Sequence, residues 1–315
     1  MIKGKKLEKG DTIGIVSPSS PSYNKSEIVR GKETLEALGY KVVLSKNLNK
    51  IKGLVAASEE ERADDINEMF RRDDIDAVFV SQGGYGAAQI ISKINFEVIR
   101  NNPKIFTGFS DITSLHLAIN KFAGLVTFHG PGMSRFNPEE ITDYTREYFF
   151  KALVDSDPIG EIKLADDKKW INPIGRGSCE APIIGGNLTL VCASLGTPFE
   201  IDTAGKILFI EELDTEPWTI DHMLSHLRNA GKLAKLAGIV IGECSNCEPR
   251  KLDPGFFCDT SLEDVLAYYI EPLGIPALYG FPLGHTKDLA TIPMGVMARL
   301  DGDLKQLVIL ESGVK

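Results

Sequence analysis

The sequence predicts an α/β protein with an N-terminal parallel, Rossmann-like sheet and a C-terminal domain that is α/β or β-rich. Short apolar strands alternate with amphipathic helices over the first third of the chain, the pattern of a parallel sheet covered on both faces. The 315 residues exceed what one hydrophobic core usually organises, so we expect two domains. A content of 43% hydrophobic and 25% charged residues is typical of a soluble globular protein.

Three of the first four predicted strands end in loops rich in glycine, serine or proline. Apolar runs predict the strands, and helical periodicity with end signals, including a capping box from Ser58 to Glu61, predicts the helices between them. The strands are expected at 12–16, 41–44, 77–81 and 104–107, and the helices at 26–38, 58–71 and 87–94. Loops 17–21, 82–86 and 108–111 each follow a strand, so we expect them to meet at the carboxyl edge, where such sheets bind ligands.

The sequence pattern changes after residue 130 and changes again near residue 178. Prolines punctuate residues 131–177, which we interpret as a connector with one helix at 143–154. Beyond it, the patterns predict strands at 206–212, 238–242 and 276–280, helices at 219–228 and 261–269, and a β-hairpin around Asp301-Gly302. The expected division is therefore an N-terminal domain at 1–130, a connector at 131–177 and a C-terminal domain at 178–315.

Charge and composition narrow the classes of partner. The 35 basic and 44 acidic residues give a net charge of −9, which argues against nucleic acid and anionic membrane surfaces as partners. No apolar run approaches the roughly 20 residues that span a bilayer. The basic start has no apolar segment behind it, so we expect no secretory signal and a cytoplasmic location.

Five cysteines include one closely spaced pair, Cys244 and Cys247, with Cys258 eleven residues further on. An odd number of cysteines in a large chain argues against a disulfide framework. A zinc site would need a fourth ligand, for which Glu243 or Asp259 is available, but there is no second pair of ligands. We therefore predict reduced thiols in a loop and no bound metal.

Ser110 lies in the turn Gly108-Phe109-Ser110-Asp111, between a short strand and a helix. Free backbone N–H groups at a helix start can hold an anion, and acyl-transfer nucleophiles occupy turns of this kind. The alternative is that Ser110 or Asp111 is only a helix cap.

A serine nucleophile needs a base and a group that orients it. Among five histidines, His285 follows a strand in a polar loop, and His129 at another strand end competes with it. Glu211 and Glu212 end an apolar strand, where a carboxylate is costly unless it is paired. Because side chains alternate, one glutamate can face a histidine while the other faces solvent.

These motifs together resemble the LD-carboxypeptidase family, serine peptidases that trim murein peptides and that include a microcin-immunity peptidase. The resemblance extends over nearly the whole chain, in the family's order. It is carried by Gly10–Ser19, Gly83-Gly84-Tyr85-Gly86, Gly108–Thr113, His129-Gly130-Pro131, Gly185-Gly186-Asn187-Leu188 with Leu195–Pro198, Phe209–Glu212, and Pro282–His285.

The resemblance implies that Ser110 is the nucleophile, His285 the general base and acid, and Glu211 the group that orients His285. It also implies an oxyanion hole formed by the backbone N–H groups of Asp111 and Gly84. Such an enzyme releases the terminal D-amino acid of a murein tetrapeptide through an acyl-enzyme, needs no metal or organic cofactor, and is typically a homodimer.

Two positions depart from the family pattern. Gln82 stands where many members carry arginine, which weakens the expected preference for a free carboxylate in the substrate. Glu212 occupies a place where aspartate is common, so the choice between Glu211 and Glu212 stays open.

Substrate contacts are expected from Gly83, Tyr85, Trp218 and Arg176. A substrate carboxylate needs a cation or N–H groups, and the candidate cations are Arg135, Arg176 and Lys287.

The sequence leaves two rival functions open. A detoxifying peptidase of the same family, acting on an aminoacyl-nucleotide or peptide antibiotic, would need an aromatic platform such as Trp218. A non-catalytic module would use Ser110 as a cap and residues 83–86 as an anion cradle.

Overall fold

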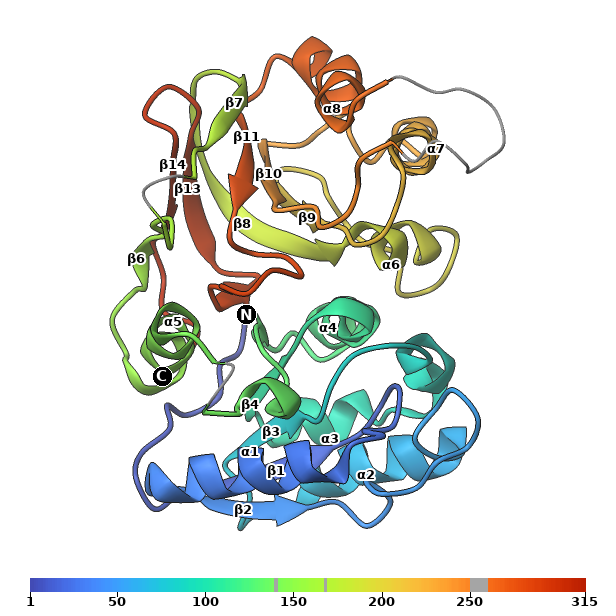
Figure 1. The fold of residues 1–315 in the computed structure, drawn as a ribbon, viewed down its shortest axis with the longest axis vertical. Coiled ribbons are helices and arrows are strands. Elements are labelled where there is room, and N and C mark those ends of the chain that lie inside the picture. Colours follow the sequence, from blue (N-terminus) through green and yellow to red (C-terminus); the bar gives the residue numbers. More distant parts are fainter. Residues whose placement is uncertain (139–140, 167–168, 250–259) are drawn as a thin grey trace. The chain divides into compact units, whose positions relative to one another are not determined.

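A computed structural model describes residues 1–138, 141–166, 169–249 and 260–315, which form two compact units (Figure 1). The first unit comprises residues 1–159, 290–296 and 311–315, and the second comprises 160–289 and 297–310. In the described residues, no helix is long and apolar enough to cross a membrane.

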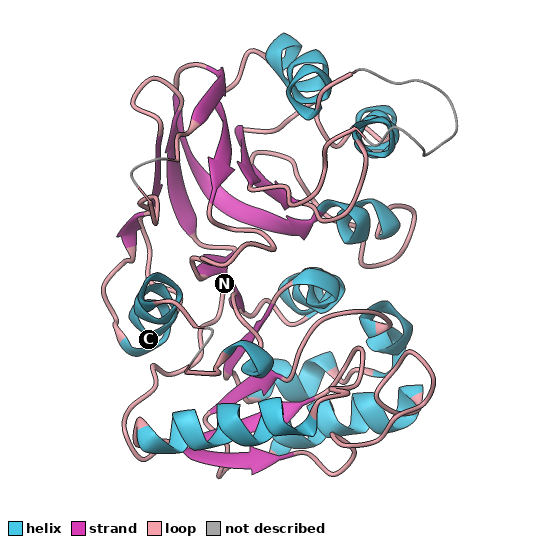
Figure 2. Ribbon diagram, viewed as in Figure 1, coloured by secondary structure: helices cyan, strands magenta, loops and turns pink. Residues whose placement is uncertain are grey.

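The first unit is built on a six-stranded sheet of order β12-β5-β4-β3-β1-β2. Figure 2 shows its strands in magenta with cyan helices packed against them. Strands β1 to β5 are parallel, and the short β12 lies antiparallel to β5 at one edge. The strands are β1 (Thr12–Val16), β2 (Lys41–Leu44), β3 (Ala77–Val80), β4 (Ile105–Gly108), β5 (Thr127–His129) and β12 (Ile292–Met294). This confirms the predicted parallel, Rossmann-like sheet of the N-terminal part.

Helices cover both faces of this sheet. The register pairs Val78 with Phe106, so Phe79 and Phe106 point to opposite faces. Phe106 packs against Phe70 of α2, whereas Phe79 packs edge-on against Phe149 of α5. The helices of this unit are α1 (Lys25–Ala37), α2 (Glu59–Arg71), α3 (Phe96–Asn101), α4 (Thr113–Phe122) and α5 (Asp143–Val154), with the predicted capping box formed between Ser58 and Glu61.

The second unit contains an eight-stranded mixed sheet of order β6-β14-β13-β8-β9-β10-β11-β7. β8, β9, β10 and β11 are parallel, while the outer strands are antiparallel to their neighbours. The strands are β6 (Gly160–Glu161), β7 (Asn172–Gly175), β8 (Ser178–Asn187), β9 (Ile207–Glu211), β10 (Gly238–Gly242), β11 (Ala277–Phe281), β13 (Met297–Asp301) and β14 (Gln306–Ile309). β13 and β14 form the predicted hairpin, and the mixed sheet confirms a C-terminal α/β domain.

The helices of the second unit are α6 (Leu188–Ala193), α7 (Pro217–Asn229) and α8 (Leu262–Ile270). Because β8 to β11 run parallel, their carboxyl ends lie at one edge of the sheet. Glu211 ends β9 at this edge, opposite Asn187 at the end of β8, and the loop with His285 follows β11.

The two units do not follow the expected boundaries. Residues 131–159 belong to the first unit, because α5 packs on its sheet through Phe149, and residues 160–177 contribute β6 and β7 to the second. Residues 290–296 return to the first unit because β12 pairs with β5, and Lys315 bonds to Gly4 and Lys6. These pairings depend on distant partners, which local patterns in the chain do not reveal.

His116 supports the end of β4 from within the first unit. It is 1% exposed, and its ring meets Phe106 edge-on. Its Nε2 lies 2.8 Å from the carbonyl oxygen of Gly108, to which it donates. Burial lowers the pKa of His116 to about 4, so the ring is neutral at pH 7.

Truncation of Phe149 should destabilise the first unit. Its ring is fully buried and contacts Phe79 and Phe136, with ring centroids 5.3 and 4.7 Å away. We expect Phe149→Ala to lower the free energy of unfolding by about 3–5 kcal/mol. Urea unfolding monitored by circular dichroism would measure this, with Glu147→Ala on the exposed side of the same helix as the control. A change below about 1 kcal/mol would contradict this packing.

Acidification should destabilise the protein through His116. Its pKa is about 4 when folded against 6.5 for an ordinary histidine, so the unfolded chain takes up the proton first. The stability contributed by the neutral ring is present above pH 6.5 and is lost as the pH falls toward 4, by about 3 kcal/mol.

Urea unfolding between pH 7 and 4 tests this by comparison of wild type with His116→Gln, which keeps an N–H group for Gly108 but cannot titrate. Wild type should lose about 3 kcal/mol more than the variant over this range. Equal pH dependence in the two proteins would rule out His116 as the cause.

Candidate active site

The three strand-end loops of the first unit meet around Asp111. Its Oδ2 accepts a hydrogen bond from the backbone N–H of Ala87 at 2.8 Å and another from the Ser19 hydroxyl. Ser20 Oγ accepts the N–H of Tyr85 at 3.0 Å, and the Gln82 amide donates to the carbonyl of Pro21 at 2.8 Å. The predicted meeting of loops 17–21, 82–86 and 108–111 is confirmed.

The order of the strands explains why these loops converge. β1 lies between β2 and β3, so the chain leaves β1 toward one side of the sheet and continues from β3 toward the other. In open parallel sheets, this reversal point leaves a crevice at the carboxyl ends where ligands bind. The loops after β1 and β3 flank this position, and Ser110 follows β4 directly beside them.

Ser110 has a left-handed backbone, with φ of 64°. Few residues other than glycine adopt this conformation, and the cost is tolerated mainly at functional sites. The serine begins a 3₁₀ turn (Ser110–Ile112) that leads directly into α4. A strand, a strained turn with serine and a helix form the arrangement of a nucleophile elbow.

The reading of Ser110 or Asp111 as a helix cap is wrong. The residue in the cap position is Phe109, and neither the 3₁₀ turn nor α4 begins with a side-chain cap. The Asp111 carboxylate instead joins the neighbouring loops, as described above. The physical reason is that the buried carboxylate finds donors in those loops, which the local sequence does not show.

Two glycines allow the loop after β3 to approach Ser110. A Cβ on Gly83 would lie 2.9 Å from Ser110 Cβ and 3.1 Å from the carbonyl oxygen of Phe109. Gly84 has φ of 115°, a conformation that L side chains rarely adopt. A larger residue at position 83 would therefore push this loop away from Ser110, whereas one at position 84 would clash with Ser20.

Arg62 of α2 is a buried residue of this site that the sequence analysis missed. It is 1% exposed, and its Nη1 donates to the carbonyls of Pro18 at 2.7 Å and Gly86 at 2.8 Å. Its Nη2 donates to the side chain of Gln89 at 2.7 Å. The available signal was its position on the apolar face of the helix, four residues before the buried Ile66.

Burial favours the neutral form of two charged groups near these loops, Asp111 and Arg62. It raises the pKa of Asp111, against the opposing effects of Ser19, Ala87 and the charge of Arg62. It lowers the pKa of Arg62, and the negative charges of Glu59 and Asp111 oppose this. The two groups thus stabilise each other's charged state.

Phe109, just before the serine, is held between two candidate residues. The Arg135 guanidinium lies 5.0 Å from the centre of the Phe109 ring, which is cation–π distance. His129 is fully buried and meets the same ring edge-on, with centroids 6.0 Å apart. Arg135 is thus a cation near the serine turn, and the buried His129 packs against the ring of Phe109.

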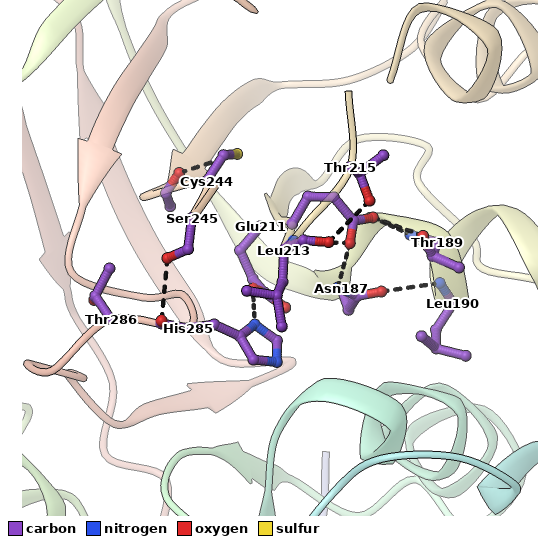
Figure 3. A network of polar contacts seen from close by, with 12 residues as sticks. Asn187, Thr189, Leu190, Glu211, Leu213, Thr215, Cys244, Ser245, His285 and Thr286 are labelled. Atoms are coloured by element: carbon purple, nitrogen blue, oxygen red, sulfur yellow. Dashed lines mark hydrogen bonds and ion pairs between the residues drawn. The ribbon is translucent and has the colours of Figure 1, made fainter. Parts of the chain in front are cut away.

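In the second unit, Glu211 and His285 are paired (Figure 3). Glu211 Oε2 lies 2.7 Å from His285 Nδ1, the Glu211 side chain is fully buried, and that of His285 is 12% exposed. Burial raises the pKa of Glu211, and the hydrogen bond from His285 opposes this. An ionised carboxylate only accepts, so Nδ1 carries the proton and Nε2 is the basic nitrogen.

The expectation that one of the two strand-end glutamates faces solvent is wrong. Glu212 is 3% exposed and accepts hydrogen bonds from Asn187 Nδ2 at 3.0 Å, from the backbone and hydroxyl of Thr189 at 2.9 and 2.7 Å, and from the N–H of Leu213 at 2.9 Å. Asn187 and Thr189, at the start of helix α6, supply three of these four donors. Glu212 therefore ties β9 to the start of α6, and Glu211 is the glutamate that meets the histidine.

The loop after β10 holds the backbone of His285. Ser245 Oγ donates to the carbonyl oxygen of His285 at 3.0 Å, and the Ser245 N–H donates to the carbonyl of Glu212 at 3.0 Å. Ser245 is thus a link between the strand end that carries the glutamates and the loop that carries the histidine.

Three expected substrate contacts lie in different settings. Tyr85 is 56% exposed beside the glycine loop, and Trp218 lies in the first turn of α7 next to His222. The Arg176 side chain is 79% exposed and pairs with Asp303 at 3.3 Å. Arg176 precedes β8, whose ten residues place it about 30 Å of strand away from the end that faces Glu211. The structure does not bring Arg176 to His285.

The described residues contain no group of three His, Cys, Asp or Glu side chains placed to hold a metal ion. Cys244 and Cys247 lie close together, whereas Cys258, the third member of the expected cluster, lies outside the described residues.

Comparison with known protein families finds one match for the N-terminal part of the chain and one for the C-terminal part. Residues 13–130 match the LD-carboxypeptidase N-terminal domain, and residues 180–300 match the LD-carboxypeptidase C-terminal domain. A probable murein peptide carboxypeptidase of Bacillus subtilis is 41% identical over 313 residues, which covers 99% of this chain and 95% of that protein.

Two solved structures have the same fold. The microcin C7 self-immunity protein MccF has a TM-score of 0.91 and 27% identity, with complete coverage of both chains. A muramoyltetrapeptide carboxypeptidase from Oxalobacter formigenes has a TM-score of 0.81 and 28% identity, covering 95% of this chain and 97% of that one. The chain therefore belongs to the LD-carboxypeptidase family of peptidases.

Proposed function

We propose that this protein is a serine-type LD-carboxypeptidase that releases the terminal D-alanine from murein tetrapeptides. The observation that carries the proposal is the 2.7 Å contact between His285 Nδ1 and the buried Glu211 carboxylate, because it prepares the imidazole as a base. The left-handed turn at Ser110 supports the assignment of the nucleophile.

The reaction assigned to these residues proceeds in two halves. His285 Nε2 takes the proton of Ser110 Oγ as the oxygen attacks the carbonyl of the L,D-peptide bond. The backbone N–H groups of Asp111 and Gly84 stabilise the oxyanion, and protonated His285 then gives its proton to the departing D-alanine amine. Water hydrolyses the acyl-enzyme by the same route in reverse, while Glu211 stabilises the imidazolium.

The substrate assignment draws on the names of the relatives and on charge. Two relatives are named as carboxypeptidases of murein or muramoyl peptides. A C-terminal substrate needs a partner for its carboxylate, and Arg135 is the cation that lies beside the residue preceding Ser110. Gln82 donates to Pro21 within the loops, so we assign it to loop structure.

Two observations favour a second function. The fold matches MccF, a self-immunity protein, with a TM-score of 0.91, and Trp218 offers an aromatic surface in the first turn of α7. A peptidase that detoxifies an aminoacyl-nucleotide or peptide antibiotic would use such a surface for stacking. Product analysis by mass spectrometry with murein peptides and an aminoacyl-nucleotide separates the two functions.

Location and assembly belong to the same proposal. We expect the enzyme to act in the cytoplasm on released murein peptides and to form a homodimer, as the family resemblance implies. Light scattering coupled to size-exclusion chromatography would report the oligomeric state.

Replacement of Ser110 or His285 should remove activity. We expect Ser110→Ala to abolish both fluorophosphonate labelling and D-alanine release, because the nucleophilic oxygen is lost. His285→Ala should lower D-alanine release by at least about a thousandfold, since no base then activates the serine. Labelling is followed by intact mass, and D-alanine by a coupled oxidase assay.

Matched controls make this test specific. Ser114→Ala removes a buried hydroxyl from α4, one turn beyond Ser110, and should leave labelling intact. His129→Gln should stay active. An inactive His129→Gln together with an active His285→Ala would transfer the role of base to His129. An unlabelled, inactive wild type would favour the non-catalytic binding module.

Glu211→Gln should lower kcat by about 10³–10⁴-fold with a smaller change in KM, because the amide no longer fixes the tautomer or stabilises the imidazolium. Glu212→Gln is the contrasting variant. It disturbs four hydrogen bonds, three of them at the start of α6, so it should lower Tm while the folded protein retains most of its kcat. Steady-state kinetics and thermal melts of both variants check this, and the reverse pattern would assign the orienting role to Glu212.

A further inference from the structure

The pair Cys244 and Cys247 has no role in the proposed reaction, yet it brackets a residue that holds the catalytic histidine. The two cysteines follow β10, in the segment Cys244-Ser245-Asn246-Cys247. Ser245 is the residue whose hydroxyl donates to the carbonyl oxygen of His285. A change in the geometry of this segment that moves Ser245 would therefore alter its hydrogen bond to the His285 backbone.

The two thiols are placed to react with each other. Each thiol donates to a backbone carbonyl of the same short segment, Cys244 to Gly242 and Cys247 to Ser245. Asn246 between them has a left-handed backbone with φ of 54°, which turns the chain. A tight turn holds residues three apart in sequence within about 7 Å between Cα atoms, which is the range a disulfide bridges. Both cysteines are unbonded thiols in the structure.

The protonation of the pair also favours this chemistry. The interaction with Cys244 lowers the pKa of Cys247, and the interaction with Cys247 together with burial raises the pKa of Cys244. Cys247 is therefore the sulfur of the pair that loses its proton more readily, and the thiolate is the form that reacts with oxidants.

Exposure selects the kind of oxidant. Cys244 is partly exposed, whereas Cys247 is 1% exposed. A second protein or a bulky disulfide would not reach the buried sulfur, so a small peroxide is the fitting reagent.

We propose that Cys244 and Cys247 are a redox modification site, at which a peroxide closes a reversible disulfide that lowers activity by displacing Ser245 and, through it, His285. The two thiols lose two protons and two electrons, the O–O bond of hydrogen peroxide breaks, and one disulfide and two waters form. A dithiol reductant restores the thiols.

The expected effect on the site follows from distances. In the thiol form, Cys244 Sγ lies 3.7 Å from the carbonyl oxygen of Gly242, and Cys247 Sγ lies 3.4 Å from that of Ser245. Closing an S–S bond of about 2.05 Å draws the sulfurs together and pulls these contacts apart. Ser245 also bonds to Glu212 and Asp214 through its backbone, so the disturbance reaches both sides of the Glu211–His285 pair.

The experiment treats the full-length reduced protein with hydrogen peroxide and maps its disulfides by peptide mass spectrometry. We expect a Cys244–Cys247 disulfide, a fall of at least about tenfold in kcat for D-alanine release, and recovery with dithiothreitol, because displacements of about 1 Å carry such costs. Cys247→Ser should keep its activity in peroxide, Cys244→Ser provides a second disulfide-free variant, and Cys179→Ser, remote in sequence, should respond like wild type.

The activity readout rests on the proposed function, so a second readout is independent of it. The imidazole Cε1–H resonance of His285, assigned by its absence in His285→Gln, should shift on oxidation of wild type and stay unchanged in Cys247→Ser. A disulfide that involves Cys258, no disulfide, or a disulfide that moves neither kcat nor this resonance would overturn the inference. An inactive reduced protein whose resonance still shifts would instead count against the proposed peptidase.

Discussion

The burial of two carboxylates, Asp111 in one unit and Glu211 in the other, constrains the rest of the candidate site. A buried carboxylate is costly unless it is hydrogen-bonded or paired, so each one determines what surrounds it. Asp111 draws the Ser19 hydroxyl and the Ala87 N–H to itself, and this joins the loops after β1 and β3 to the turn of Ser110. Glu211 is paired with His285, and this fixes which ring nitrogen is basic.

Other side chains in each unit hold the backbone of the strand-end loops through hydrogen bonds. Arg62 binds the carbonyls of Pro18 and Gly86 and so holds two loops from below. His116, neutral because it is buried, holds the carbonyl of Gly108 just before the serine turn. Glu212 and Ser245 do the equivalent work in the second unit, where they tie the ends of β9 and β10 to neighbouring elements. In the first unit, the strained turn of Ser110 is thus supported by groups that act on the backbone of the neighbouring loops.

Much of this arrangement could be predicted from sequence, because local patterns carry it. The capping box at Ser58, the strand at 238–242 and the helix at 143–154 appear in the structure at the expected positions. Features decided by distant partners could not be predicted in this way. Arg62 looks like an ordinary charged residue of a helix, residues 292–294 give no sign that they pair with β5, and Glu212 shows its four donors only once β8 and α6 are folded. The roles of Ser110, Glu211 and His285 come from the family resemblance, and the pairing of Glu211 with His285 gives the geometry on which two of those roles depend.

The proposed reaction requires that Ser110 carry the acyl group of the substrate. The most direct measurement is acid quenching of the enzyme with a murein tetrapeptide within the first turnover, followed by digestion and mass spectrometry. We expect a tripeptidyl ester on the peptide that contains Ser110, formed at the rate of D-alanine release and lost as water hydrolyses it. Release of D-alanine without any adduct, or an adduct on a different residue, would contradict it.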